Sequence, residues 1–373
     1  MNTVPTRQIA VSAPRFFGNE SKYVQECLDS TWVSSIGRFI PLFEQGFADL
    51  CQVPYAVSSN TGTSALHLAL LGLGIQPGDE VIVPTLTFVA TANAVSYCGA
   101  KPVFVDAEPR TMNLDPALLA ARITPRTRAI IVVHLYGHPA DMEPILAIAR
   151  RHSLPVIEDA AEAHGALYRG RIAGSLADLA TFSFFGNKII TTGEGGMVTT
   201  ANPELASRIR VFRGQGMQPD RRYWFPVIGF NYRMTNIQAA LGLAQLEQID
   251  RYIAHHRTVA AWYDHYLAPA GAALQLPVEE PWARHSYWLY TLVLSPTVSA
   301  SRDSIIASLA AAGIETRPVF YPMHVLPPYF EPNACYPVAD RLSARGLSLP
   351  THIALSEDDV AYIAAHLLRL LAE

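Results

Sequence analysis

The sequence predicts an α/β fold, with a large domain built on a mainly parallel sheet and a small C-terminal α+β domain. Short runs rich in β-branched residues alternate with helical stretches between about residues 53 and 200, a pattern typical of βαβ units. The length of 373 residues also exceeds what one hydrophobic core usually supports. Pro and aromatic residues become more frequent after Asp250, so we predict a large domain over residues 1–249 and a small one over 250–373.

The expected elements follow from hydrophobic periodicity and from helix-end signals. Strands of the large domain are expected at residues 80–84, 102–105, 129–134 and 155–157. Helices are expected at residues 63–73 and 141–152, and one long helix at 236–267 leads into the C-terminal part. That part should contain a strand at residues 287–294 and helices at 302–312 and 357–371.

Composition excludes several classes of protein. Half of the residues are apolar and 16% are charged, which excludes a disordered chain and suggests that a partner subunit covers apolar surface. The net charge of -4 without a basic run argues against nucleic acid as a partner. Four widely spaced cysteines fit a reducing compartment, and the chain shows neither a signal-peptide pattern nor a membrane span. We therefore expect a cytoplasmic protein that does not bind a membrane.

The segment TFSFFGNKIITTGEGGM, residues 181–197, carries one lysine between a strand and a glycine-rich turn. At the end of a strand in an open α/β sheet, Lys188 would face a crevice. Burial there would lower its pKa and free the amine to form a Schiff base with an aldehyde cofactor. Ser183, five residues earlier, could hold a phosphate. The alternative is a solvated surface lysine.

The segment VIEDAAEAHGA, residues 156–166, ends a strand with two adjacent acids. Side chains of Glu158 and Asp159 must point to opposite faces, so only one can reach a site at the strand end. An Asp there could pair with a pyridine nitrogen and keep it protonated, or it could simply cap a helix. Glu162 and His164 are candidates for contacting the cofactor's hydroxyl edge or the substrate, with ordinary polar packing as the alternative.

Two further segments supply parts of the same kind of site. SSNTGTSAL, residues 58–66, puts small hydroxyl and glycine residues before an apolar helix, where free N–H groups can bind phosphate or where the motif only caps the helix. Phe88 follows another expected strand and could stack on an aromatic ring or belong to the core.

Together these segments resemble the DegT/DnrJ/EryC1/StrS family of sugar aminotransferases over nearly the whole chain, from the region of Trp32 to the final helix. SFFGNKIITTGEGG and EDAAEAHGA are the most specific motifs. The resemblance implies an aspartate-aminotransferase-like fold and a pyridoxal 5'-phosphate (PLP) cofactor that becomes pyridoxamine 5'-phosphate in the half-reaction. It implies a transaminase, with a product used in O-antigen or polysaccharide biosynthesis.

The resemblance also implies roles for single residues. Lys188 would bond to the cofactor and move protons, and Asp159 would pair with the pyridine nitrogen. Glu162 stands where many relatives have Gln or His, and Thr61 replaces a frequent Asn or Ser, so their contacts are less fixed by the family pattern. The remaining cofactor positions are Phe88 on the ring, Gly62, Thr63 and Ser183 at the phosphate, and Asn231, which would reach the phosphate of the neighbouring subunit in a homodimer with shared active sites.

The substrate is also indicated by resemblance. VFRGQGM, RRYWFPVIGFNYRMTN and TRPVFYPMHVLPPY resemble members that aminate carbon 4 of GDP-4-keto-6-deoxy-D-mannose with L-glutamate and give GDP-perosamine. A UDP- or dTDP-linked sugar, or a 3-keto sugar, is the alternative. Arginines such as Arg213 could bind diphosphate or carboxylate, or form structural ion pairs. The expected substrate-binding residues are Trp32, Arg233, Arg317 and His324, beside aromatic side chains at 223–225 and 320–329.

Three other functions fit the sequence less well. A metal-dependent hydrolase could use His134, His138 and Asp141, but Gly137 and Pro139 interrupt the helix that such a ligand set normally needs. A cofactor-binding regulator without activity would lack the lysine or the acid, and both are present. Relatives that remove a sugar hydroxyl carry histidine at the lysine position. We therefore expect an aminotransferase without a metal site.

Overall fold

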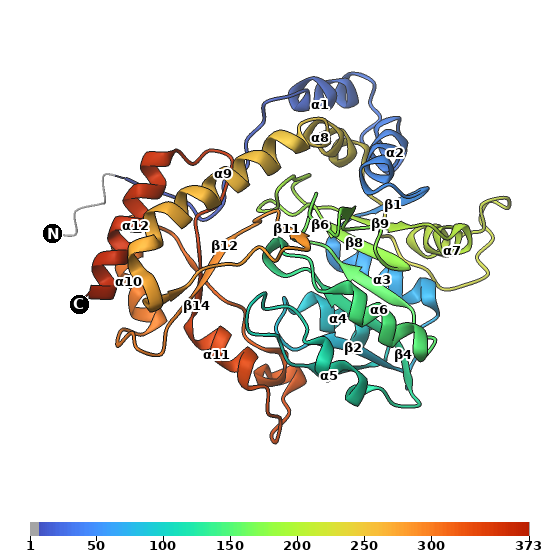
Figure 1. The fold of residues 1–373 in the computed structure, drawn as a ribbon. Helices are drawn as coiled ribbons and strands as arrows, with labels where there is room; N and C mark the ends of the chain where they lie inside the picture. Colours follow the sequence, from blue (N-terminus) through green and yellow to red (C-terminus); the bar gives the residue numbers. More distant parts are fainter. Residues whose placement is uncertain (1–6, 373) are drawn as a thin grey trace.

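A computed structural model describes residues 7–372, and its centre is a seven-stranded sheet (Figure 1). Parallel pairing joins four neighbouring pairs of strands, and only β9 runs antiparallel to its neighbours β1 and β8. The predicted mainly parallel sheet is therefore confirmed. Six strands bring their carboxyl ends to one edge. In spatial order the sheet contains β1 (Tyr55–Ser59), β9 (Gly196–Thr200), β8 (Leu179–Ser183), β5 (Val156–Asp159), β4 (Thr127–Val133), β2 (Glu80–Pro84) and β3 (Lys101–Val105).

Helices cover both faces of this sheet. Side chains alternate between the faces of a strand, so Val81 and Val83 of β2 join one core while Ile82 joins another. The first core includes α3 (Gly62–Leu73) and α4 (Ala90–Tyr97), and the second includes α6 (Met142–Arg151) and α5 (Pro116–Leu119), with α6 in front of the sheet in Figure 1. Strands buried on both faces explain the continuous apolar runs in the sequence.

The predicted single helix over residues 236–267 is wrong, because the structure has two helices there. α8 (Asn236–Leu246) and α9 (Ile249–Leu267) are separated at Gln248, whose φ of -114° is not helical. Next to the break, the buried amide of Gln245 donates to Glu20 (2.6 Å) and to the hydroxyl of Tyr252 (2.8 Å). Neither Pro nor Gly marks the break, so long-range contacts decide it. α8 packs on α1 (Glu20–Asp29) and α2 (Phe39–Cys51), whereas α9 packs on α12 (Glu357–Ala372).

The C-terminal part has its own antiparallel sheet and core, as expected for a small α+β unit. The strand predicted at 287–294 begins later, because Tyr287 has a left-handed φ of 50° and its N–H donates to the ring of His285. The elements of this sheet and its helices are β10 (Leu274–Gln275), β12 (Tyr290–Leu294), β14 (Gly346–Leu349), β13 (Arg317–Pro318), α10 (Arg302–Ala311) and α11 (Pro337–Arg345).

Short elements complete the structure. A three-stranded sheet of β6 (Leu167–Tyr168), β7 (Arg171–Ile172) and β11 (Ala283–Arg284) joins the two parts, and α7 (Pro203–Arg213) packs on α3. Short 3-10 segments lie at η1 (Ala120–Arg122), η2 (Leu135–Gly137), η3 (Ala268–Ala273), η4 (Met323–Val325) and η5 (Pro327–Tyr329).

The first described residues pack against the C-terminal part of the chain. Ile9 forms a parallel bridge with Ile314, and the carbonyl of Val11 accepts from the N–H of Thr351 (3.0 Å). The boundary predicted between residues 249 and 250 stays a prediction, and this N-terminal segment would belong with the second unit.

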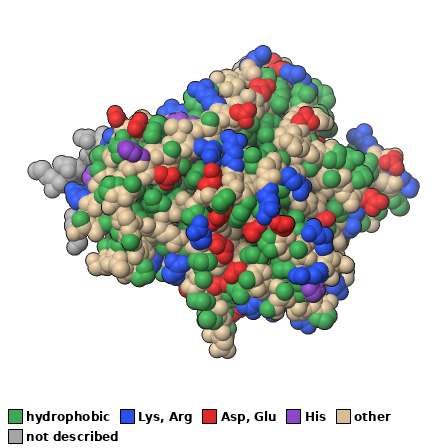
Figure 2. Space-filling model, viewed as in Figure 1, with side chains coloured by type: hydrophobic (Ala, Val, Ile, Leu, Met, Phe, Trp, Pro, Cys, Tyr) green, Lys and Arg blue, Asp and Glu red, His purple; other side chains and the backbone are tan. Residues whose placement is uncertain are grey.

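The surface mixes both signs of charge. On the face shown in Figure 2, Lys and Arg side chains are interspersed with Asp and Glu. Within residues 7–372, no helix combines the length and apolarity that crossing a bilayer requires.

Candidate active site

The residues predicted from separate segments meet along the carboxyl edge of the large sheet. Asp159 is the last residue of β5 and Ser183 the last of β8, while Gly62 begins α3 just after β1. Phe88 follows β2 and lies just before α4. Ligands of open α/β sheets bind outside the carboxyl ends of the strands, so this edge is the candidate site.

Lys188 lies in the loop after β8, and its side chain is only 11% exposed. Its Nζ lies 3.6 Å from Oε1 of Glu162 and 3.7 Å from the centre of the Trp288 ring. Burial lowers the pKa of Lys188, although the carboxylates of Glu162 and Asp159 oppose that shift. The other two lysines of the chain, Lys22 and Lys101, are exposed. The alternative of a solvated Lys188 is therefore wrong.

The two acids that end β5 point to opposite faces, as predicted. Glu158 is fully buried behind the strand, where it contacts His134 (3.0 Å) and accepts from the backbone N–H groups of residues 174, 176 and 177. Asp159 faces the other way and accepts from the hydroxyl of Thr91 (2.8 Å). Burial raises the pKa of Asp159, and no Lys, Arg or His side chain among the described residues forms an ion pair with it. A cationic partner would stabilise this carboxylate.

Glu162 is buried beside the lysine and is held by a backbone contact. Its Oε2 accepts from the N–H of Tyr136 (2.7 Å), while Oε1 faces Lys188. Burial raises the pKa of Glu162 to about 7, and the charge of Lys188 limits the rise. This acid can therefore exchange a proton near neutral pH.

The beginning of α3 forms an anion-binding cradle. The hydroxyl of Thr61 caps the helix by accepting from the N–H of Ser64 (3.0 Å). The N–H groups of Gly62 and Thr63 have no acceptor among the described residues, as is usual in a first turn. A Cβ on Gly62 would lie 2.7 Å from Cβ of Ser183, so only glycine lets the helix approach that hydroxyl. The cradle fits a phosphate group.

Four aromatic side chains form a row beside Lys188. Phe88 is 54% exposed and packs against Phe320, with ring centres 5.7 Å apart. Phe320 stacks on Tyr136 (5.6 Å), which in turn stacks on Trp288 (6.2 Å). The exposed ring of Phe88 leaves a face on which an aromatic ligand can stack.

Two predicted contacts do not match the geometry. His164 is fully buried among phenylalanines, and its ring nitrogens have no hydrogen-bond partner among the described residues. Burial lowers its pKa to about 3, so the ring belongs to the core. The ring nitrogens of buried His324 already contact Thr85 (2.8 Å) and Asp340 (3.1 Å), which argues against the predicted contact with substrate.

The predicted arginine contacts divide into two groups. Arg213 is a structural residue, because its guanidinium contacts Glu44 (2.7 Å) and the carbonyl of Ser58 (2.9 Å). Arg317 lies close enough to lower the pKa of Lys188 by charge repulsion, and its only ion pair among the described residues is a 3.9 Å contact with Glu315. It can therefore bind an anionic ligand.

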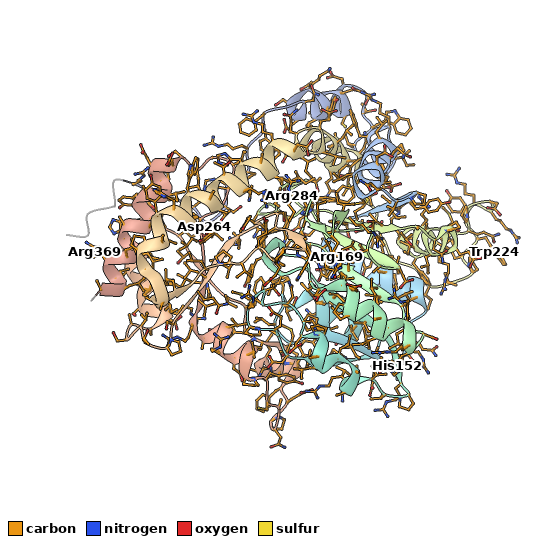
Figure 3. All side chains as sticks on the ribbon, viewed as in Figure 1. His152, Arg169, Trp224, Asp264, Arg284 and Arg369 are labelled. Atoms are coloured by element: carbon orange, nitrogen blue, oxygen red, sulfur yellow. The ribbon has the colours of Figure 1, made fainter. Side chains whose placement is uncertain are left out.

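Other predicted residues lie at the surface of the chain. Asn231 accepts from the guanidinium of Arg233 (3.2 Å), and both are exposed. Trp32 is also exposed, and its carbonyl accepts from the amide of Asn236 (2.8 Å). Trp224, in the aromatic stretch at 223–225, lies far to the right in Figure 3, beyond α7 and away from the sheet. None of these side chains contacts Lys188.

The metal-site alternative finds no support. The ring of His134 contacts the carboxylate of Glu158 (3.0 Å). The ring of His138 contacts the carbonyl of Pro139 (2.7 Å) and the N–H of Glu280 (3.2 Å). In the part of the chain that the structure describes, no group of three or more potential ligands could hold a metal ion.

Three residues of the site are not among those predicted from the sequence: Thr91, Tyr136 and Trp288. Thr91 lies three residues after Phe88, one helical turn further on, and that spacing could have indicated it. Tyr136 has a left-handed φ of 55°, but nothing in the sequence marks this conformation. Trp288 comes from the other end of the chain, so only the fold brings it to Lys188.

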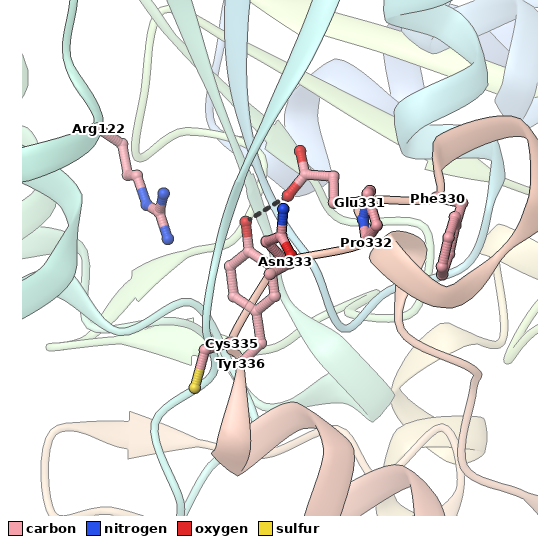
Figure 4. Close-up of a pocket in the computed structure, with 8 residues that line it drawn as sticks. Arg122, Phe330, Glu331, Pro332, Asn333, Cys335 and Tyr336 are labelled. Carbon is pink, nitrogen blue, oxygen red and sulfur yellow. Dashed lines mark hydrogen bonds between the residues drawn. The ribbon is translucent and has the colours of Figure 1, made fainter.

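A separate hollow of about 490 Å³ lies under residues 330–336 and beside Arg122 (Figure 4). Its lining includes Glu331, which accepts from the hydroxyl of Tyr336 (3.0 Å), and exposed Cys335. No residue of the Lys188 site lines it.

Comparison with known proteins decides the family. The profile of the DegT/DnrJ/EryC1/StrS aminotransferase family matches residues 16–368. The chain belongs to this family. It is 58% identical over 361 residues to GDP-perosamine synthase of Caulobacter vibrioides, with 96% of this chain and 97% of that relative covered. Identity to GDP-perosamine synthase of Escherichia coli O157:H7 is 48% over 357 residues, with coverage of 96% and 97%.

Solved structures of proteins described as sugar aminotransferases have the same fold. A Streptococcus pneumoniae protein described as a sugar aminotransferase, in its PLP form, superimposes with a TM-score of 0.92 at 29% identity, covering 98% of this chain and 99% of that one. The protein is a PLP-dependent sugar aminotransferase of this family, as the sequence predicted.

Proposed function

We propose that the enzyme transfers the amino group of L-glutamate to carbon 4 of GDP-4-keto-6-deoxy-D-mannose and gives GDP-perosamine, with Lys188 as the catalytic residue. The observation that carries the proposal is the position of Lys188. It is a buried lysine at the carboxyl edge of the sheet, with the carboxylates of Asp159 and Glu162 at the end of β5 and in the turn after it, and an anion cradle at the start of α3.

The residues of the site fit PLP. When bound, PLP supplies an aldehyde that carries the amino group and a ring that accepts electrons. Gly62, Thr63 and Ser183 would bind its phosphate, and Phe88 would stack on its ring. Asp159 would face the ring nitrogen, whose positive charge would stabilise the buried carboxylate.

Lys188 performs two tasks in this proposal. Its Nζ would hold the cofactor in the resting enzyme, and the free amine would move a proton from the cofactor to the sugar carbon during transfer. The lowered pKa of Lys188 favours this role, because an amine with a lower pKa is unprotonated in a larger fraction of molecules near neutral pH. Oε1 of Glu162 lies 3.6 Å from Nζ of Lys188, and this carboxyl group can accept a proton from the amine or donate one to it.

The choice of substrate rests on the relatives. Two relatives named GDP-perosamine synthase are 58% and 48% identical over almost the whole chain. Arg317, whose one ion pair within residues 7–372 is the 3.9 Å contact with Glu315, would bind an anionic group of the donor or of the nucleotide sugar. Trp32 and Arg233 keep their predicted roles as substrate-binding residues.

A homodimer with shared sites forms part of the proposal. Asn231 and Arg233 lie on the surface, where they could reach a neighbouring subunit. Large apolar side chains are also exposed nearby, including Tyr223, Trp224 and Ile228, and a partner would cover them. Three buried free thiols, Cys27, Cys51 and Cys98, support the predicted cytoplasmic location, where thiols stay reduced.

A panel of nucleotide sugars tests the proposal. The purified enzyme is incubated with PLP and L-glutamate, and with GDP-4-keto-6-deoxy-D-mannose or with UDP- and dTDP-linked 4-keto and 3-keto sugars. Mass spectrometry of the product should show amination of the GDP sugar at the highest rate. Faster amination of a UDP- or dTDP-linked sugar would overturn the choice of substrate, and a chain that elutes as a monomer in solution would overturn the shared site.

A further inference from the structure

Trp288 contacts the lysine segment at two points. It is buried just before β12, and its indole N–H donates to the carbonyl of Asn187 (2.7 Å), the residue before Lys188. The centre of its ring lies 3.7 Å from the lysine Nζ. A single side chain from the C-terminal part of the fold therefore restrains both the backbone and the amine of the lysine.

A carboxylate completes the surroundings of the amine. Tyr136 stacks on Trp288 with an interplanar angle of 13°, and its N–H directs the carboxylate of Glu162, whose free oxygen faces Nζ. An aromatic face and a carboxylate both attract an ammonium group. The charged or titratable groups that act on this amine are Glu162, Asp159, Arg317 and the uncharged ring of His164.

We propose that Trp288 is a positioning residue that holds the Lys188 amine whenever the amine is not bonded to the cofactor, and that its ring favours the protonated form. The inference rests on the role proposed for Lys188. Burial alone would drive the free amine toward its neutral form, and the ring offsets part of that effect. The lysine then stays in place during the half of the reaction in which it must deliver a proton.

The chain permits a direct test, because it contains only three lysines. Competitive acylation of the full-length, cofactor-free protein over a range of pH, read by mass spectrometry, gives the ionisation midpoint of Lys188, with exposed Lys22 and Lys101 as internal references. Two variants of similar volume isolate the ring. Trp288→Phe keeps an aromatic face near Nζ, whereas Trp288→Leu removes it, and both lose the indole N–H.

The midpoint of Lys188 should be lower in W288L than in W288F by roughly one pH unit, because the ammonium loses its aromatic partner. A control variant, Trp282→Leu, removes a tryptophan that packs on Tyr168 and His138 and should leave the midpoint unchanged. Equal midpoints in the two Trp288 variants, or a higher one in W288L, would overturn the proposal.

A second measurement needs no variant and applies even where W288L does not fold. A crystal structure of the cofactor-free protein should place Nζ within about 6 Å of the Trp288 ring centre. An amine turned away from the ring would refute the inference. Neither measurement uses a sugar or a donor, so a wrong substrate in the proposed function would not affect the outcome.

Discussion

The hydroxyl of Thr91 donates a hydrogen bond to Oδ2 of Asp159 over 2.8 Å, and both side chains are buried. Thr91 belongs to α4 and Asp159 to β5, so a helix over one face of the sheet fixes the orientation of an acid at its edge. The second oxygen accepts weakly from the N–H of Ala161 (3.3 Å). The carboxylate is thus oriented by neutral donors, and within residues 7–372 no cationic side chain forms an ion pair with it.

Asp159→Asn should separate folding from catalysis. The amide oxygen can still accept from Thr91, and the cost of burying a charge disappears, so the melting temperature should stay the same or rise. Activity should fall at least about a hundredfold, because a neutral amide cannot keep a ring nitrogen protonated. Thermal unfolding and steady-state rates check this pair of expectations. Activity within tenfold of the native enzyme would contradict the role of Asp159.

Lys188→Ala should leave a folded protein without turnover. The native enzyme with PLP should absorb in the visible and bleach when L-glutamate is added, whereas the variant should show neither the lysine-bound band nor bleaching with turnover. Lys101→Ala is the matched control. That lysine is exposed and begins β3, so it lies at the amino edge of the sheet, opposite to the edge that carries the candidate site. Turnover by K188A would exclude the lysine as the catalytic group.

Glu162→Gln should change how stability depends on pH. Burial raises the pKa of Glu162 from 4.5 to about 7, so this carboxyl group binds a proton more tightly in the folded protein than in the unfolded chain. A raised pKa contributes stability that is fully present below pH 4.5 and lost as the pH rises through 7. As the pH rises over this range, the free energy of unfolding of the native protein should therefore fall by up to about 3 kcal/mol relative to that of E162Q. Urea unfolding at pH 5 and pH 7.5 measures this difference. If the unfolding free energies of both proteins changed equally between the two pH values, the raised pKa of Glu162 would be excluded.

Gly62→Ala should weaken both folding and cofactor binding. The new Cβ would lie 2.7 Å from Cβ of Ser183 and 3.2 Å from its Cα, so the start of α3 must move away from β8. We expect a loss of about 1–3 kcal/mol in unfolding free energy, which is typical of overpacking, and weaker PLP binding by equilibrium titration.

Gly46→Ala provides the control for that variant. There the new Cβ meets only methyl groups at the ends of flexible side chains, one of Leu246 at 3.0 Å and one of Leu243 at 4.0 Å, and the alanine favours the helix. Its stability and its PLP affinity should remain close to native values. If both glycine variants bound PLP equally well, the cradle at the start of α3 would not be the phosphate site.

Residues at strand ends could be predicted from the sequence because the topology forces them together. Once the sheet is parallel, Asp159 and Ser183 must lie on the same edge, and alternation along β5 decides which of two adjacent acids faces the site. These inferences need only the order and direction of strands.

The rest of the site depends on contacts between distant segments. Trp288 reaches Lys188 from 100 residues further along the chain, and the left-handed turn at Tyr136 has no sequence signal. The break between α8 and α9 is likewise set by Gln245, whose partners lie on other helices. The burial of His164 and His324 could not be foreseen for the same reason, since a polar residue beside a motif can face either side.

The back of β5 limits where this enzyme can be redesigned. Glu158 is buried on the face of β5 opposite to Asp159, and it ties the strand to His134 and to the turn at residues 174–177. Its replacement would leave several buried donors unsatisfied and shift the main chain that carries Asp159. Libraries aimed at new sugars should therefore vary the rim and keep this hidden carboxylate, although a search confined to ligand contacts would treat it as dispensable.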